Sequence, residues 1–214
     1  IIQGVTEFLP ISSSSHLILI AEYLDFENQS LSIDVSLHIG SFIAVISYFY
    51  KDIINFYENK ILFLKILISS IPIMLIGFFL AKSGLIEKIR GLEVIAWTTL
   101  IFGFLLYISD KFKLEKNIKN DFNLKSAIII GFLQILSLVP GVSRLGIALT
   151  AARFLKFKRT DAAKISFLLS IPILGAVSTY GFTNILFSKD INFTMMNLIA
   201  IFLSFLFSLI TIKY

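Results

Sequence analysis

The chain has 214 residues, of which 57% are hydrophobic and only 15% are charged, and its mean hydropathy is +0.88. Soluble domains carry about 25% charged residues, so the composition excludes an ordinary soluble domain and predicts a polytopic membrane protein. The formal net charge of +5 comes from basic residues in short loops between apolar segments. That pattern is typical of membrane orientation and argues against nucleic acid as a partner. The absence of cysteine excludes disulfides, thiolate metal sites and a cysteine nucleophile.

The chain opens with two short apolar pieces, residues 1–9 and 11–24, which are separated by Pro10. A proline at this place breaks a helix, so we expect a re-entrant hairpin, a pair of short helices that enters and leaves on one side of the membrane. A second broken pair, residues 125–139 and 143–155, surrounds Pro140 and Gly141. The remaining apolar segments are long enough to span a bilayer, and they cover residues 34–50, 61–81, 91–109, 161–186 and 193–212.

Charge on both sides of the second hairpin predicts its topology. Basic residues both precede and follow it: Lys111, Lys113, Lys116 and Lys119, then Arg153, Lys156, Lys158 and Arg159. Both flanks are therefore expected to be cytoplasmic, and the second basic group is expected to anchor anionic lipid heads. Counting crossings backwards places the loop at 25–33, which has no Lys or Arg, on the outer side. The first hairpin then opens outward.

Two halves of one transmembrane domain, residues 1–214, follow the same order of hairpin and spans, at about 1–109 and 125–214. The motif Pro10-x-x-Ser13 is echoed by Pro140-x-x-Ser143, and residues 70–73 recur letter for letter at 170–173. Opposite hairpin orientations make this an inverted repeat, in which the tips of broken helices meet near the bilayer midplane. Because the chain starts inside an apolar segment and ends abruptly, we expect a fragment that lacks part of the first helix and the C-terminal helix.

The two breaks carry groups that favour an anion. New helices are expected to begin at Ser12 to Ser15 and near Val142-Ser143, and helix N-termini offer unpaired N–H groups with a positive dipole end. Arg144 adds a permanent charge and a planar fork of donors suited to phosphate oxygens.

Reactive groups lie beside the first break. Ser13 and His16 are three residues apart on one helical face, so the imidazole could act with the hydroxyl as a base or a binder. Gln3 and Glu7 are four apart, where a carboxylate could hold a divalent cation, orient water or accept a proton. The combination suits phosphoryl chemistry.

Other interpretations stay open. Glu7 and Arg144 could be an ion pair that fixes the fold, and serines in membrane helices often bond a backbone carbonyl. His38, near Asp34 at an expected helix start, is interpreted as a structural histidine. An inverted repeat with broken helices also describes many transporters, so a flippase for a lipid phosphate, or a carrier of another anion, is the alternative function. A carrier needs an anion-binding site but no nucleophile.

Residues 3–16, with the letters QGVTEFLPISSSSH, and residues 140–144, PGVSR, closely resemble the two signature regions of the bacterial undecaprenyl-diphosphatase (bacitracin-resistance) family. The resemblance implies an inverted repeat with paired re-entrant helices in the bacterial plasma membrane. It implies a hydrolase that converts undecaprenyl diphosphate to undecaprenyl phosphate and inorganic phosphate, which recycles the carrier lipid for peptidoglycan synthesis. The expected active site faces the outer, periplasmic side, and a homodimer is left open.

The resemblance also implies roles for individual residues. Glu7, Ser13, His16 and Arg144 would be catalytic, and Ser12, Gly141, Ser143 and Arg144 would bind the diphosphate. Glu7 and Gln3 would hold a divalent cation, Mg²⁺ or Ca²⁺. Whether Ser13, His16 or water attacks stays open.

The chain departs from the family pattern at three places. Leu145 and Ile147 stand where relatives carry serine and threonine, and Gln3 leaves one carboxylate where many relatives have two. Thr150 lies seven residues past Ser143, about 10.5 Å along a helix, so it is a weak substitute for the missing hydroxyls.

Overall fold

The structure, a computed structural model, describes residues 1–24, 31–57, 59–83, 85, 89, 91–112, 115–187 and 195–214. Within these ranges the regular structure is helical, apart from one isolated parallel bridge between Lys116 and Phe157. The helices are α1 (Ile2–Thr6), α2 (Ser13–Tyr23), α3 (Leu31–Tyr48), α4 (Tyr50–Asn55), α5 (Lys60–Ser83), α7 (Leu92–Asp110), α8 (Ile118–Asp121), α9 (Leu124–Gln134), the 3₁₀ helix η1 (Ile135–Leu138), α10 (Arg144–Phe154), α11 (Arg159–Phe187) and α12 (Met195–Lys213). Lys113 and most of the predicted outer loop, residues 25–30, lie outside the described residues.

Among the described residues, four helices are long and apolar enough to cross a membrane, namely α5, α7, α12 and the part of α11 from Arg159 to Thr183. Shorter apolar helices cover Ser32–Tyr48 and Leu124–Leu138. Large apolar side chains along α7, such as Trp97, Leu100 and Phe104, are exposed on the protein surface, as expected for a helix that faces lipid. The prediction of an all-α, multi-pass membrane protein is confirmed, and each predicted span coincides with a helix to within a few residues.

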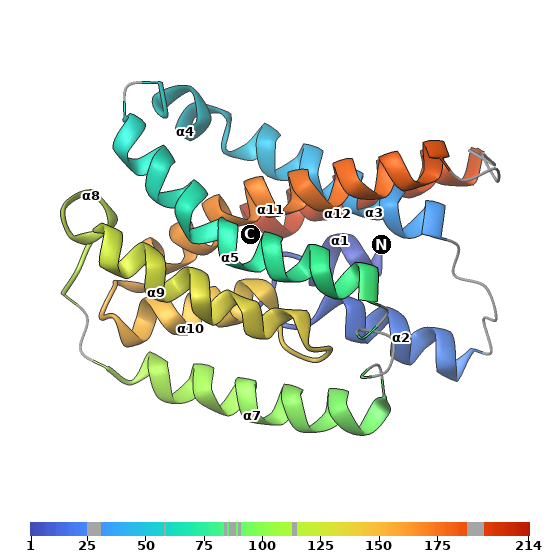
Figure 1. Cartoon of the computed structure of the whole chain (residues 1–214), viewed down its shortest axis with the longest axis horizontal. Helices are drawn as coiled ribbons and strands as arrows, with labels where there is room; N and C mark the ends of the chain where they lie inside the picture. The colour runs from blue at the N-terminus through green and yellow to red at the C-terminus, as the bar shows by residue number, and fades with distance from the viewer. Residues whose placement is uncertain are drawn as a thin grey trace.

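Helix α11 runs through the middle of the bundle and packs against α3, α5 and α10, while α12 packs against α3 and α1 (Figure 1). Helix α9 lies along α5, and α7 lies along α10 on the outside of the bundle. Two prolines that stand inside long helices, Pro72 in α5 and Pro172 in α11, leave those helices continuous. Membrane helices tolerate such prolines because neighbouring groups satisfy the freed backbone.

Small residues bring α1 and α3 against α12. A Cβ atom added to Gly40 of α3 would lie 2.4 Å from the carbonyl oxygen of Ile201, and one added to Gly4 of α1 would lie 2.8 Å from that of Ser204. The Ser41 hydroxyl bonds those of Ser204 and Ser208 at 3.1 and 3.0 Å. Close backbone approach with interhelical hydroxyl bonds is the usual way helices associate in lipid. It holds α1 and α3 side by side on one support.

Both predicted helix breaks are present. Helix α1 ends at Thr6 and α2 begins at Ser13, with Pro10 between them; α10 begins at Arg144, just after Pro140 and Gly141. Whether each pair re-enters the same membrane face, and whether the halves form an inverted repeat, stay predictions.

Helix α10 is held by α7 at both ends. At its start, Gly141 has a φ of +94°, and a Cβ atom there would lie 1.8 Å from the Thr98 hydroxyl oxygen of α7. That hydroxyl donates to the Pro140 carbonyl at 2.7 Å. At its other end, Arg153 forms an ion pair with Asp110 at 2.7 Å. Glycine is needed in this turn both for its backbone conformation and for its lack of a side chain.

One expectation about the basic loop is wrong. Arg153 was expected among the lipid anchors, but its side chain is only 1% exposed and bonds the carbonyl oxygens of Asp110 and Phe157 in addition to the ion pair. Arg159, although exposed, also pairs with Asp110. A guanidinium can satisfy several backbone carbonyls at once, so these two residues fasten helix ends together.

Candidate active site

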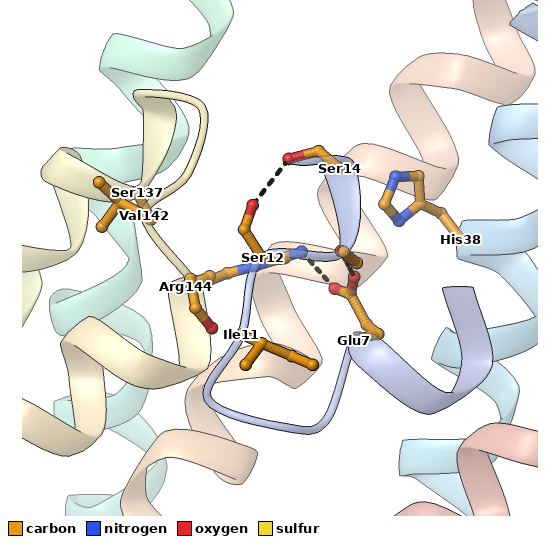
Figure 2. Close-up of a pocket in the computed structure, with 10 residues that line it drawn as sticks. Glu7, Ile11, Ser12, Ser14, His38, Ser137, Val142 and Arg144 are labelled. Atoms are coloured by element: carbon orange, nitrogen blue, oxygen red, sulfur yellow. Dashed lines mark hydrogen bonds and ion pairs between the residues drawn. The ribbon is translucent and has the colours of Figure 1, made fainter. Parts of the chain in front are cut away.

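The tips of the two broken pairs meet. Glu7 follows α1 directly and Arg144 is the first residue of α10; the Glu7 Oε1 atom lies 2.5 Å from Arg144 Nη2 (Figure 2). The Ser13 hydroxyl, at the start of α2, donates to Glu7 Oε2 at 2.6 Å. The Ser143 hydroxyl donates to the Leu9 carbonyl at 3.4 Å. Segments more than 130 residues apart in sequence therefore share one site, as the sequence predicted.

Glu7 accepts hydrogen bonds from three donors. Besides Arg144 and Ser13, the Gln3 side-chain amide donates to Glu7 Oε2 at 2.9 Å. The Glu7 side chain is 5% exposed and that of Arg144 is 21% exposed, so the pair lies largely out of water. Coulomb attraction is strong there, but each charge needs its partner, because an uncompensated buried charge is costly.

Arg144 has donor capacity left over. Its Nη1 atom is buried and has no hydrogen-bond partner among the described residues. Native proteins rarely leave a buried donor unpaired, and such a group often marks a place where a ligand or water binds. One side of the guanidinium fork is therefore occupied by Glu7, and the other is free for an oxyanion.

The site encloses a cavity of about 100 Å³. Its lining combines the ion pair, serine hydroxyls and a few apolar side chains: Glu7, Ile11, Ser12, Ser13, Ser14, His38, Ser137, Val142, Ser143 and Arg144. A second cavity of about 150 Å³ shares Ser13, Ser14 and His38 with the first and adds Gln3, Leu17, Ile18, Asp34 and Leu37. The cavities adjoin, so the polar site continues between α2 and α3.

Two serines cap the helices that begin at the cavity. Ser12 Oγ accepts from the Ser15 backbone N–H at 3.4 Å, and Ser143 Oγ accepts from the Gly146 N–H at 3.1 Å. Serine is a favoured N-cap residue because its hydroxyl satisfies one of the unpaired N–H groups of the first turn. The predicted helix starts are confirmed, and the positive ends of α2 and α10 both lie at the cavity. Gly141, predicted to bind substrate, does not line the cavity; it packs against Thr98.

The two histidines are placed differently from the sequence interpretation. His16 Nδ1 lies 2.7 Å from the Ser12 carbonyl oxygen of its own helix, and His16 lines neither cavity. His38, interpreted from sequence as structural, lines both cavities, and its Nδ1 atom lies 3.3 Å from Gln3 Nε2. Figure 2 shows the His38 ring on the Glu7 side of the cavity. The sequence signal that could have found it is the polar stripe of Asp34, His38 and Ser41 along an apolar helix.

The hydroxyls that the family pattern expects after Arg144 are not replaced. Leu145 and Ile147 are both buried, and Leu145 belongs to the hydrophobic core. Thr150 donates its hydroxyl to the Gly146 carbonyl of its own helix at 2.8 Å, so it offers nothing to the cavity. The polar groups that α10 presents to the cavity are therefore Arg144, Ser143 and the N–H groups of its first turn.

The residues of the site fit a divalent cation only if a bound substrate supplies further oxygen ligands. Among the described residues there is no group of three or more His, Asp or Glu side chains that could hold a metal ion. Both Glu7 oxygens accept hydrogen bonds, and Gln3 turns its N–H₂ group, not its oxygen, toward Glu7. Mg²⁺ is commonly held by one or two carboxylates, substrate phosphates and water. Glu7 could supply the one carboxylate of such a site.

The fold and the site define a class: a multi-pass membrane protein whose polar cavity, lined by serine hydroxyls and a buried Glu–Arg pair, is built from the tips of broken helices. The chain belongs to the bacitracin resistance protein BacA family, which it matches over residues 1–214. It is 45% identical over 215 residues to the undecaprenyl-diphosphatase of Pelagibacter ubique, covering 100% of this chain and 84% of the relative. It is 39% identical over 223 residues to that of Jannaschia sp., covering 98% and 83%, and 42% identical over 204 residues to that of Saccharophagus degradans, covering 90% and 77%.

Proposed function

We propose that the protein is an undecaprenyl-diphosphatase, which hydrolyses undecaprenyl diphosphate to undecaprenyl phosphate and inorganic phosphate and so recycles the carrier lipid for peptidoglycan synthesis. Membership of the family and the names of the relatives support this function. The structural observation that carries it is the Glu7–Arg144 pair with Ser13 on the same carboxylate and Arg144 Nη1 unpaired.

Arg144 and the two helix N-termini bind the phosphate oxygens. Phosphoryl transfer needs donors fixed where negative charge is spread over the transferring group. Arg144 is held in place by Glu7 through Nη2, which leaves Nη1 for a phosphate oxygen. Ser12 and Ser143 cap α2 and α10, and both residues line the same cavity.

Glu7 is the proton acceptor. Its Oε2 atom lies 2.6 Å from the Ser13 hydroxyl oxygen, within reach for general-base catalysis. If Ser13 attacks, its Oγ bonds the terminal phosphorus, the bridging P–O bond breaks toward the lipid phosphate, and water then hydrolyses the phosphoserine. If water attacks, Glu7 takes a proton from that water, and Ser13 only binds the substrate phosphate. The predicted catalytic role of His16 lacks support, because the His16 ring bonds the Ser12 carbonyl and the Ser13 hydroxyl bonds Glu7.

A divalent cation, Mg²⁺ or Ca²⁺, is part of this proposal. Glu7 would hold it together with phosphate oxygens of the substrate, and the cation would neutralise charge on the diphosphate. A chelator is then expected to lower phosphate release by the purified protein, with recovery on adding one of the two ions. Fast release in the chelator would contradict the requirement.

We place the protein in the bacterial plasma membrane with the cavity facing the outer side. The support is the distribution of charge: basic residues lie near the ends of α7 and α10 that are remote from Arg144, including Lys116, Lys119 and Lys156. The positive-inside rule assigns that end to the cytoplasm. Because the chain has no cysteine, single variants Lys119→Cys and Ile11→Cys can be labelled in spheroplasts with a membrane-impermeant maleimide. Only the second is expected to react, and the reverse result would overturn the orientation.

An inverted repeat is also proposed. Its support is a reciprocal packing pattern: α1 of the first broken pair lies on α12 of the second half, and α9 of the second pair lies on α5 of the first half. Helices α3 and α11, which follow the two pairs, pack on each other. Helix α7 stands outside this pattern. The homodimer stays a prediction.

The decisive experiment is phosphate release from undecaprenyl diphosphate by the purified protein in detergent or vesicles. Arg144→Ala is expected to be inactive, and Arg159→Ala, a matched loss of an arginine remote from the cavity, is expected to be active. A transporter or flippase would bind the lipid at the same cavity but release no phosphate. Absence of release by the wild-type protein, with lipid translocation intact, would favour that alternative.

A further inference from the structure

We propose that His38 is a positioning residue for the catalytic carboxylate, acting on Glu7 through the side-chain amide of Gln3. This inference rests on the proposed phosphatase function. It assigns a role to a residue that lies 35 positions away from Gln3 in sequence and belongs to neither signature motif.

The first step is the double contact of the Gln3 amide. Its Nε2 atom lies 2.9 Å from Glu7 Oε2 and 3.3 Å from His38 Nδ1, and the residue is only 2% exposed. An amide N–H₂ group has two hydrogens, so it can donate to both atoms. These two acceptors therefore favour the orientation in which the N–H₂ group of the amide, and not its oxygen, faces Glu7.

The second step concerns the His38 tautomer. Nδ1 can accept from Gln3 only when it carries no proton, which requires a neutral ring with its hydrogen on Nε2. Removing this acceptor leaves the amide free to turn its oxygen toward Glu7. Two oxygens would then face each other, and Glu7 Oε2 would lose one of its two donors.

The third step links that orientation to catalysis. Glu7 Oε2 is also the acceptor for the Ser13 hydroxyl, while Oε1 receives Arg144. A carboxylate that loses the Gln3 bond can rotate away from Ser13, and small displacements of a catalytic group are costly in rate. His38 itself is carried by α3, which Gly40 and Ser41 hold against α12.

The kinetic test compares two variants at position 38 with a control variant elsewhere on α3. His38→Leu removes the acceptor at similar size, whereas His38→Asn keeps an acceptor oxygen on the same carbon and lacks a titrating ring. His38→Leu is expected to lower kcat about tenfold or more, a fraction of what a positioned base contributes, with KM within about twofold. His38→Asn is expected to stay within about threefold of the wild type. Ile43→Leu, on the exposed side of α3, serves as the control for insertion and folding.

Non-additivity gives a second kinetic criterion. If His38 acts only through Gln3, the double variant Gln3→Ala with His38→Leu is no slower than Gln3→Ala alone. Multiplied losses would overturn the proposal, and so would a His38→Asn variant as slow as His38→Leu, because that result would indicate a proton transfer by the ring. A His38→Leu variant with wild-type kcat would overturn it as well.

A spectroscopic measurement separates this inference from the proposed function. The chain has two histidines, so ¹⁵N labelling of histidine gives two sets of ring signals. His38 is expected to show the Nε2–H tautomer, and Gln3→Ala is expected to shift its Nδ1 signal while the signals of His16 stay in place. An Nδ1–H tautomer or a charged ring at His38 would overturn the inference, whether or not the protein releases phosphate. An inactive wild type with the expected spectrum would count against the phosphatase function alone.

Discussion

Replacement of Arg144 is the most informative perturbation, because this residue serves both the fold and the proposed chemistry. Arg144→Ala removes the donor that faces the cavity and leaves Glu7 buried without its counter-ion. Loss of one preorganised donor to a developing oxyanion costs about 10²- to 10³-fold in kcat, and Arg144 also supplies a full charge. We therefore expect phosphate release to fall by about 10³-fold or more.

The stability effect can be separated from the catalytic one. Breaking a buried ion pair by removing one partner costs about 3–5 kcal/mol. Because Arg144 is 21% exposed, solvent screens the pair in part, and the expected loss is nearer the lower end of that range. Replacing both partners removes the unpaired charge. The double variant Glu7→Gln with Arg144→Met is expected to recover thermal stability without recovering activity.

Arg144→Lys tests the geometry of the fork. A lysine ammonium has one nitrogen and cannot bond Glu7 and a phosphate oxygen in the plane in which the guanidinium does. We expect about 10²-fold lower kcat with membrane insertion unchanged. Phosphate release by purified protein measures kcat, and thermal unfolding in detergent measures stability.

An Arg144→Ala protein that inserts normally and keeps more than about a tenth of wild-type turnover would refute the site assignment, because the loss would then fall below that of a single oxyanion donor.

Two further substitutions test the serine and the glycine turn. Ser13→Ala removes the hydroxyl that donates to Glu7 and is expected to lower kcat by about 10²-fold or more. Ser14→Ala is the control and is expected to lower kcat far less. Equal kcat values for the two variants would exclude a special role for Ser13. Gly141→Ala places a Cβ atom 1.8 Å from the Thr98 hydroxyl oxygen at a φ of +94°, so about 1–3 kcal/mol of backbone strain adds to the clash and the midpoint of thermal unfolding should fall. Gly103→Ala serves as the control, because Gly103 lies on α7, the helix that carries Thr98, and a Cβ atom there meets no atom within 4 Å. A similar fall in both proteins would show that the turn has no such requirement.

Local patterns in the sequence determine much of this fold. Runs of apolar residues mark the spans, Pro10 and Pro140 mark the breaks, and the serines that precede α2 and α10 cap those helices. The contact between Gln3 and Glu7 follows from their spacing of four, with Gln3 in α1 and Glu7 as its C-cap. Each of these features depends on residues a turn or two apart, which is why the sequence alone predicts it.

The histidines show where sequence reasoning ends. Ser13 and His16 have the spacing of neighbours on a helix, yet the His16 ring bonds the Ser12 carbonyl and the Ser13 hydroxyl bonds Glu7. Spacing gives the face of a helix but not the rotamer that a side chain adopts among competing acceptors. His38 reaches Gln3 only because α1 and α3 pack on the same face of α12 through Gly4 and Gly40. Such a contact is a property of three packed helices, and no local pattern specifies it.

The Glu7–Arg144 pair need not be assigned to the fold or to catalysis alone. A buried donor that stays unpaired costs about 1–3 kcal/mol, so the unpaired nitrogen contributes nothing to the role of the pair in stabilising the fold. Here Glu7 satisfies one end of the guanidinium while Nη1 is buried beside the cavity without a partner among the described residues. The ion pair stabilises a charged arginine in the apolar interior. The unpaired nitrogen of that arginine is a donor that a bound anion would satisfy. In the proposed function, stability and phosphate binding therefore use different nitrogens of the same side chain.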